Sequence, residues 1–251
     1  MISVFNAGEG EASVQCDGQG QYRPIVLDLG QDRKGNFLFD LRRPDNKKER
    51  LPQWSREGLS RLGSLQLGPG SHHQERFILN EWTDLDTAGR YLLEARLTAP
   101  IKGVDGTSIT EAPPMIVDFE VAPRDELALS LACEVLVRRI EGSVEVGEAL
   151  EAAQSLSFIR DPVAVYYLGR ALRSGRMVEI PVISGLERIA NREAVQALIA
   201  LVGQDPWTAD IATGSGTTKV LARSALQNIE RKTQDADMRE MIRRALKRPG
   251  E

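Results

Sequence analysis

The residues of this chain that could bind a metal begin with its only two histidines, His72 and His73, which Glu75 follows closely. In an extended strand, side chains two positions apart share one face, so His73 and Glu75 could present two ligands together. A zinc site needs at least three protein ligands, and no second cluster accompanies this one. Both histidines also lie in one segment, which leaves no serine–histidine–aspartate arrangement. We therefore expect no metal, no cofactor and no catalytic residue here.

Two other segments could contact ions. Asp84 and Asp86 could contact a cation, but a calcium loop needs more oxygen ligands over a longer run, which favours a turn. The segment GSGTTK at 214–219 has some residues of a phosphate-binding loop. The spacing G-x-x-x-x-G-K-[ST] after a strand is missing, so we expect a linker.

The two cysteines, Cys16 and Cys133, lie far apart in the chain and form no C-x-x-C pair. This spacing argues against a metal or redox site. Two buried free thiols are the expected state, and a disulfide between Cys16 and Cys133 remains an alternative.

Composition and charge exclude several classes of protein. Of the 251 residues, 41% are hydrophobic and 27% are charged, which is typical of a globular protein. The net charge is −4, all of it before Ala122, where 14 basic residues accompany 18 acidic ones. Neither half has the basic excess of a nucleic-acid-binding protein. No apolar run is long enough to span a membrane. The one basic cluster includes acidic residues, which favours a solvated loop; it comprises Arg42, Arg43, Lys47, Lys48 and Arg50.

Residues 1–122 have the pattern of an antiparallel β-sandwich, with about eight short apolar segments separated by turn residues. YRPIVLDL and NFLFDL flank GQDRKG and predict a hairpin, and ERFILNEW predicts a strand over 75–82. Tyr91 follows a turn of small residues and predicts a tyrosine corner, in which the phenol hydroxyl bonds to upstream backbone. Leu93, Ala95 and Leu97 then share one face of a strand. We expect Tyr91 and Trp82 to have structural roles.

Residues 123–251 have the longer period of helices, and about seven are expected. Asp161 followed by Pro162 predicts a helix start, as does Asn191. Gly142 predicts the end of the first helix. That helix is expected to bury one stripe, made of Leu127, Leu131, Val135 and Ile140.

The helical half resembles HEAT-type repeats. The segments that carry the resemblance are DPVAVYYLGRAL, MVEIPVISGLERIANREAVQALIALVGQD and KVLARSALQNIE, within 161–247. The loop GQDPWTADIATGSG is long for a repeat turn, so a compact irregular bundle is the alternative. Such helix pairs stack into a short solenoid with a concave surface, which implies protein binding.

The first half resembles bacterial immunoglobulin-like modules, among them the intracellular proteinase inhibitor (BsuPI-like) domain. The carrying segments are VFNAGEGEASVQC and LGPGSHHQERFILNEWTDLDTAGRYLLEARL. The resemblance implies no catalytic residue. It implies an exported bacterial protein whose leader is absent here, with a cytoplasmic location as the alternative.

These observations predict an immunoglobulin-like sandwich over 1–122 and a HEAT-like helical domain over 123–251. The expected function is non-enzymatic protein–protein interaction, with an unknown protein as partner. Trp207, in the long loop, is the residue expected to anchor that partner. The alternatives are a proteinase inhibitor acting through the sandwich loops, and a metal-binding or enzymatic protein using His72, His73 and Asp84.

Overall fold

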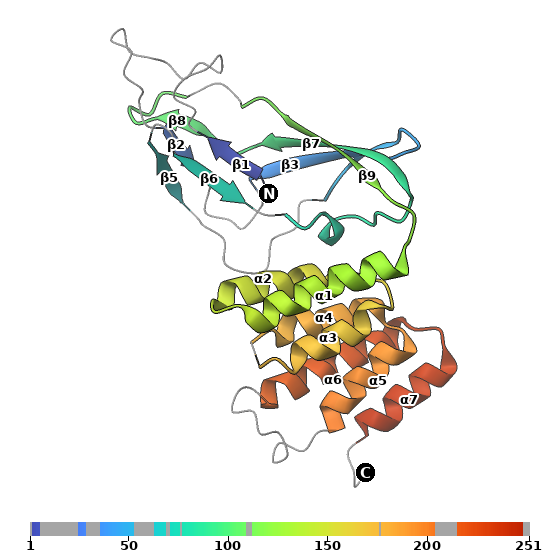
Figure 1. The fold of residues 1–251 in the computed structure, drawn as a ribbon. Coiled ribbons are helices and arrows are strands. Elements are labelled where there is room, and N and C mark those ends of the chain that lie inside the picture. The colour runs from blue at the N-terminus through green and yellow to red at the C-terminus, as the bar shows by residue number, and fades with distance from the viewer. Residues whose placement is uncertain are drawn as a thin grey trace. The chain divides into compact units, whose positions relative to one another are not determined.

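The protein divides into two compact units, Met1–Pro123 and Arg124–Glu251, in a computed structural model. The structure describes residues 2–5, 25–28, 36–52, 63–68, 71–75, 77–108, 112–175, 177–203 and 215–247. The first unit contains β-sheets and the second contains helices, as Figure 1 shows. The expected order of β structure followed by α structure is confirmed.

The largest sheet of the first unit has four antiparallel strands in the order β4-β3-β7-β9. They are β3 (Phe37–Arg42), β4 (Lys48–Arg50), β7 (Gly89–Leu97) and β9 (Met115–Val121). The register sets Phe39 beside Ala95 and Tyr91 beside Phe119. Because side chains alternate along a strand, these four side chains lie on one face of the sheet.

Two smaller antiparallel sheets complete the described strands of this unit. In one, β2 (Ile25–Asp28) lies between β5 (Ser64–Leu67) and β8 (Ile101–Gly103); in the other, β1 (Ile2–Phe5) pairs with β6 (His72–Glu75). The predicted hairpin between β2 and β3 is therefore wrong, because the two strands belong to different sheets. The predicted strand over 75–82 is also wrong: β6 ends at Glu75, and a 3-10 helix follows at Leu79–Glu81.

The core of the four-stranded sheet is aromatic. Phe39 lies 4.7 Å from Trp82 and 4.9 Å from Phe77, between ring centroids. Tyr91 is fully buried and stacks on Phe119, and its hydroxyl donates to the Thr87 carbonyl at 2.8 Å. The predicted return of this hydroxyl to upstream backbone is confirmed, as are the structural roles of Tyr91 and Trp82.

The basic cluster is more ordered than the solvated loop that its composition predicted. Arg42 ends β3, and Lys48 and Arg50 form β4, which pairs antiparallel with β3. Asp40 of β3 is the reason: its carboxylate, only 5% exposed, accepts from Arg50 Nε at 2.9 Å. Arg96 of β7 donates to the same carboxylate at 2.9 Å.

The second unit contains seven helices in its described part, as expected. They are α1 (Glu126–Gly142), α2 (Val146–Ser157), α3 (Ala164–Leu172), α4 (Glu179–Ile189), α5 (Arg192–Gly203), α6 (Ser215–Lys232) and α7 (Ala236–Leu246). Asn191 Oδ1 accepts from the Ala194 amide at 2.8 Å, and Asp161 Oδ1 from the Val163 amide at 3.0 Å. Asn191 therefore caps the start of α5. The predicted N-cap at Asp161 is wrong: its carboxylate lies in the turn before α3, whose N-cap is Val163 with no side-chain cap. The predicted linker at 214–219 is wrong from Ser215 onward, where α6 begins.

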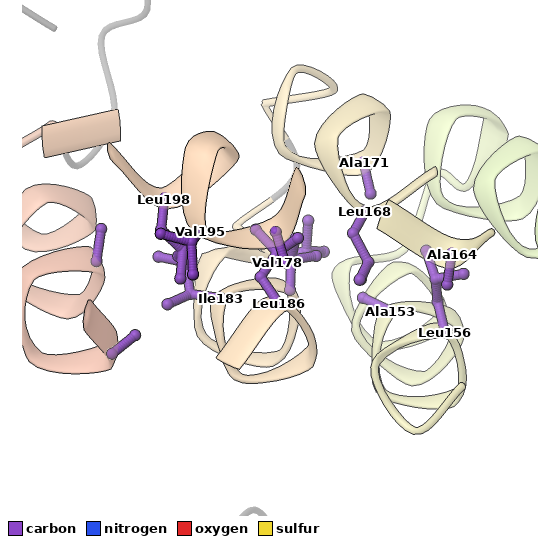
Figure 2. Close-up of a cluster of buried hydrophobic side chains, with 14 of the residues drawn as sticks. Ala153, Leu156, Ala164, Leu168, Ala171, Val178, Ile183, Leu186, Val195 and Leu198 are labelled. Carbon is purple, nitrogen blue, oxygen red and sulfur yellow. The ribbon is translucent and has the colours of Figure 1, made fainter. Parts of the chain in front are cut away.

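These helices form two rows. Helices α1, α3, α5 and α7 are neighbours in one row, and α2, α4 and α6 are neighbours in the other; α1 pairs with α2, α3 with α4, and α5 with α6. Figure 2 shows buried side chains from α2, α3, α4 and α5 gathered in the interior. Fully buried Leu168 and Leu186 are among them. None of the helices in the described ranges is long and apolar enough to cross a membrane.

One glycine sets the spacing in this interior. A Cβ at Gly185 of α4 would lie 2.9 Å from the Ser157 Cα at the end of α2, and 3.1 Å from Leu168 Cδ2 of α3. The first distance is shorter than real Cβ contacts and the second is tighter than most, so the missing side chain is what allows α4 to approach α2 this closely.

The stripe predicted to be buried on α1 is wrong for three of its four residues. Leu127, Leu131 and Val135 are 71%, 59% and 66% exposed. The buried face is instead made of Cys133, Val137 and Ile140. Helix α1 is apolar on two sides, and periodicity alone does not show which of them contacts the neighbouring helices.

Candidate interaction surface

The metal ligands considered from the sequence do not form a site in the structure. His72 lies in β6, whose backbone pairs with β1, and its side chain is exposed. The side chains of His73 and Glu75 lie outside the described residues. Within the described ranges, no group of three or more histidine, cysteine, aspartate or glutamate side chains is arranged to hold a metal.

The turn that contains Asp84 and Asp86 is organised by an arginine. Arg43 donates to the Asp84 carbonyl at 3.0 Å and to Thr83 Oγ1 at 2.7 Å. Its guanidinium also lies 3.9 Å from the Asp86 carboxylate. Arg43 therefore anchors the segment that contains Asp84 and Asp86.

Cys133 is a free, fully buried thiol on the inner face of α1. Burial raises its pKa to about 11, because the surrounding apolar side chains disfavour the thiolate. A thiol in this state is a poor nucleophile at neutral pH. Cys16 and Trp207 lie outside the described residues, so their predicted roles stay predictions.

Asp40 is the most enclosed charged side chain among the described residues of the first unit. Hydrogen bonds from the Arg50 guanidinium hold the pKa of Asp40 below its usual range. Arg96 and Lys48 Nζ lie 2.9 Å and 3.4 Å from the same carboxylate. Because its oxygens are occupied by three cations of the protein, Asp40 joins β3, β4 and β7 and has a structural role.

The most unusual surface in the described ranges is the exposed side of α1. We call Leu127, Leu131 and Val135 the α1 face. Successive members are four residues apart, so they lie one above another along the helix. Each is more than half exposed, at 71%, 59% and 66%. Ala128 and Ala132, beside them, are also exposed. Contiguous apolar patches of this kind mark protein interaction sites more often than scattered single residues do.

The packing of α1 fixes this face away from the core of the helical unit. The Asp125 carboxylate caps the helix by accepting from the Ala128 amide at 3.1 Å. Cys133, Val137 and Ile140 on the opposite side are fully buried in the core of the helical unit. Turning the α1 face inward would expose these three side chains, so the helix cannot rotate without losing its own packing.

Ion pairs border the α1 face at the start of the helix. Arg124 Nε donates to Asp161 at 2.6 Å, which ties the residue before the N-cap to the turn before α3. This contact lowers the pKa of Asp161 and raises that of Arg124.

A second group of ion pairs borders the face at the end of the helix. Arg170 of α3 donates to Glu134 at 2.7 Å and to Glu141 at 2.8 Å, and Arg138 donates to Glu134 at 2.7 Å. Hydrogen bonds from Arg138 and Arg170 lower the pKa values of Glu134 and Glu141, respectively. An apolar centre with a charged border is the usual anatomy of a protein–protein interface.

The scan against protein-family models finds no match to this chain, and the searches of curated proteins and of solved structures find none either.

Proposed function

We propose that this protein is a non-enzymatic interaction protein and that the α1 face is the surface where it binds another protein. The observation that carries the proposal is the exposure of Leu127, Leu131 and Val135 on consecutive turns of a helix whose other side is fully packed. Full burial of each such side chain is worth about 1.5–3 kcal/mol. A partner that covers the α1 face therefore stabilises the complex by removing these side chains from water.

The arrangement of the helices supports this function. Two rows of helices, paired α1–α2, α3–α4 and α5–α6, are what a short HEAT-like stack requires. In such stacks the terminal repeat needs a polar outer face to remain soluble on its own. Within the helical unit, α1 packs against α2 and α3, and its outer face is apolar. This end of the stack is therefore suited to being covered by a partner.

The first unit is proposed to be an immunoglobulin-like module that serves as a spacer or anchor. The hydrogen bond from the Tyr91 hydroxyl to the Thr87 carbonyl supports the assignment, because a tyrosine corner is characteristic of such sandwiches. The order β4-β3-β7-β9 of the main antiparallel sheet is compatible with it.

Photo-crosslinking in native extract tests the proposed function. A photoreactive residue is placed at position 131 of the full chain and, as the control, at position 220. Val220 is 67% exposed on α6 and matches Val135, which is 66% exposed. We expect a defined crosslinked protein from position 131 only, and we expect Val135→Glu, but not Val220→Glu, to remove it. Equal crosslinking from the two positions, or none from position 131, would refute the proposal.

A further inference from the structure

We propose that the outer edge of β9 binds an extended segment of a partner protein, which adds a strand to the four-stranded sheet. The segment alternates basic with apolar residues. The inference does not use the α1 face and is independent of the proposed function. It rests on the unpaired backbone of β9, its exposed apolar side chains and the acidic residues of its outer face.

The backbone of β9 is paired on one side only. All seven of its residues lie beside β7, from Met115 opposite Ala95 to Val121 opposite Gly89. Among the residues that the structure describes, no hydrogen bond joins the backbone of β9 to anything except β7. In an antiparallel pair, every second residue directs its N–H and its C=O away from the neighbouring strand. Such a row of donors and acceptors is complementary to another extended backbone.

The two edges of this sheet differ. At the edge opposite β9, strand β4 (Lys48–Arg50) has three residues, and each of them is charged. Short, charged edge strands are a common protection against pairing with another chain. Strand β9 has seven residues, and its first three, Met115, Ile116 and Val117, are 36%, 62% and 38% exposed. The protection found at β4 is therefore missing from β9.

The apolar residues of the partner segment have a defined place. Met115, Val117 and Phe119 lie on the face of the sheet that carries Tyr91 and the aromatic core. Every second side chain of an added strand lies on this same face, beside these three. Apolar side chains there would cover the exposed parts of Met115 and Val117, and apolar pairs between adjacent strands stabilise a sheet.

The opposite face of β9 carries two acidic residues, Asp118 and Glu120. A single guanidinium, that of Arg90 on β7, pairs with Asp118 and lies opposite Glu120 in the register. The next cation on this face, Arg42, is one strand further away, opposite Leu92. Two carboxylates therefore share one cation, which lies on the β7 side. Basic side chains of an added strand would meet them from the unpaired side, where opposite charges on adjacent strands stabilise pairing.

A second copy of β9 fits this edge less well than a basic segment does. If two copies of β9 paired, Asp118 and Glu120 of both would lie on one face, where four carboxylates would share the two Arg90 guanidinium groups. Like charges on adjacent strands weaken the pairing. The charges therefore favour a segment of a different protein.

Peptide binding by the full chain is the first test. The probe is an acetylated heptapeptide that alternates valine with lysine, and the control has glutamate in place of lysine. The lysine peptide should bind with a dissociation constant below about 1 mM. The glutamate peptide should bind at least about five-fold more weakly. Weaker binding of the lysine peptide than this, or equal binding of the two peptides, would overturn the inference.

Methylation of the peptide amides tests strand addition itself. One version of the lysine peptide is methylated on its valine amides and another on its lysine amides. Only every second residue of an added strand directs its N–H toward β9. One version should therefore lose affinity at least about ten-fold, while the other should keep it. Equal effects of the two methylations would show that β9 does not pair with the peptide backbone.

Glu120→Lys tests the position of the peptide on the protein. It should weaken binding of the lysine peptide and strengthen binding of the glutamate peptide, each about two- to five-fold. Glu193→Lys makes the same change of charge at an exposed residue of α5 and is the matched control. Circular dichroism at 222 nm confirms that both variants fold. Equal effects of the two variants would contradict a site at β9.

Hydrogen exchange locates the peptide and identifies the alternative occupant. Alternate amides of β9 should exchange rapidly in the free chain and slowly once the lysine peptide is bound, whereas those of β4 should not change. Peptide binding without this protection would overturn the inference. Protection of these amides without peptide, in a chain that sediments as a dimer, would show that a second copy occupies the edge and would also overturn it.

Discussion

Gly185→Ala should destabilise the helical unit, although alanine is the better helix former. In the interior of a helix, the exchange of glycine for alanine gains about 1 kcal/mol from propensity alone. At position 185 the new Cβ would lie 2.9 Å from the Ser157 Cα. This backbone cannot move easily, because Ser157 is buried and its carbonyl accepts from Arg188 Nη1 at 3.2 Å. Overpacking of this kind costs about 1–3 kcal/mol.

The control for this variant is Gly169→Ala. Gly169 also lies inside a helix, α3, but its Cβ would find only Arg173 Nη1, at 3.9 Å. Gly169→Ala should therefore keep the full propensity gain of about 1 kcal/mol. The difference between the two variants isolates the contact, and we expect Gly185→Ala to be less stable by about 1–3 kcal/mol. Urea unfolding of the full chain, followed at 222 nm, measures both. Equal stabilisation by the two alanines would refute this account of how α4 packs on α2.

Three further predictions concern single side chains. Tyr91→Phe should cost about 0.5–1.5 kcal/mol, because the hydroxyl loses its carbonyl partner while the ring keeps its stacking; hydrogen exchange of the β7 amides measures this. The folded pKa of Asp40 is depressed, so its stabilisation is complete above the unfolded pKa of about 3.9 and is lost as the pH falls through the folded value. The stability difference between the wild type and Asp40→Asn should therefore shrink between pH 6 and pH 2, as exchange of the β3 amides would show. Cys133, alone in a Cys16→Ser variant, should react with a thiol reagent at pH 8 only after unfolding; rapid reaction of the folded chain would contradict its burial.

The helices were predictable because their ends carry local signals. Asn191 is a capping residue in the sequence and caps α5 in the structure, whereas the same signal at Asp161 marks the turn that comes just before α3. The Tyr91 hydrogen bond was predictable for a similar reason, since its acceptor, Thr87, is only four residues away.

Features that depend on distant parts of the chain were not predictable. The turn residues after β2 predicted a hairpin with β3, but β2 pairs with β5 and β8. Strand β4 is short and charged, and only its pairing with β3 reveals it. The α1 face was mistaken for core, because Leu127, Leu131 and Val135 have the spacing that buried residues also have. Only the positions of α2 and α3 show which side of α1 is covered.

The strand pairing of the first unit has a consequence for the order of folding during synthesis. Strand β2, near residue 25, pairs with β8, near residue 101, and β1 pairs with β6. These sheets cannot close until most of the unit has left the ribosome, and pairings so distant in sequence form slowly. In the helical unit, each new helix finds its neighbours already made, since α3 contacts α1 and α2, and α4 contacts α2 and α3. The first unit can therefore fold only after nearly all of its residues have been synthesised, whereas the helical unit can build up helix by helix as the chain emerges.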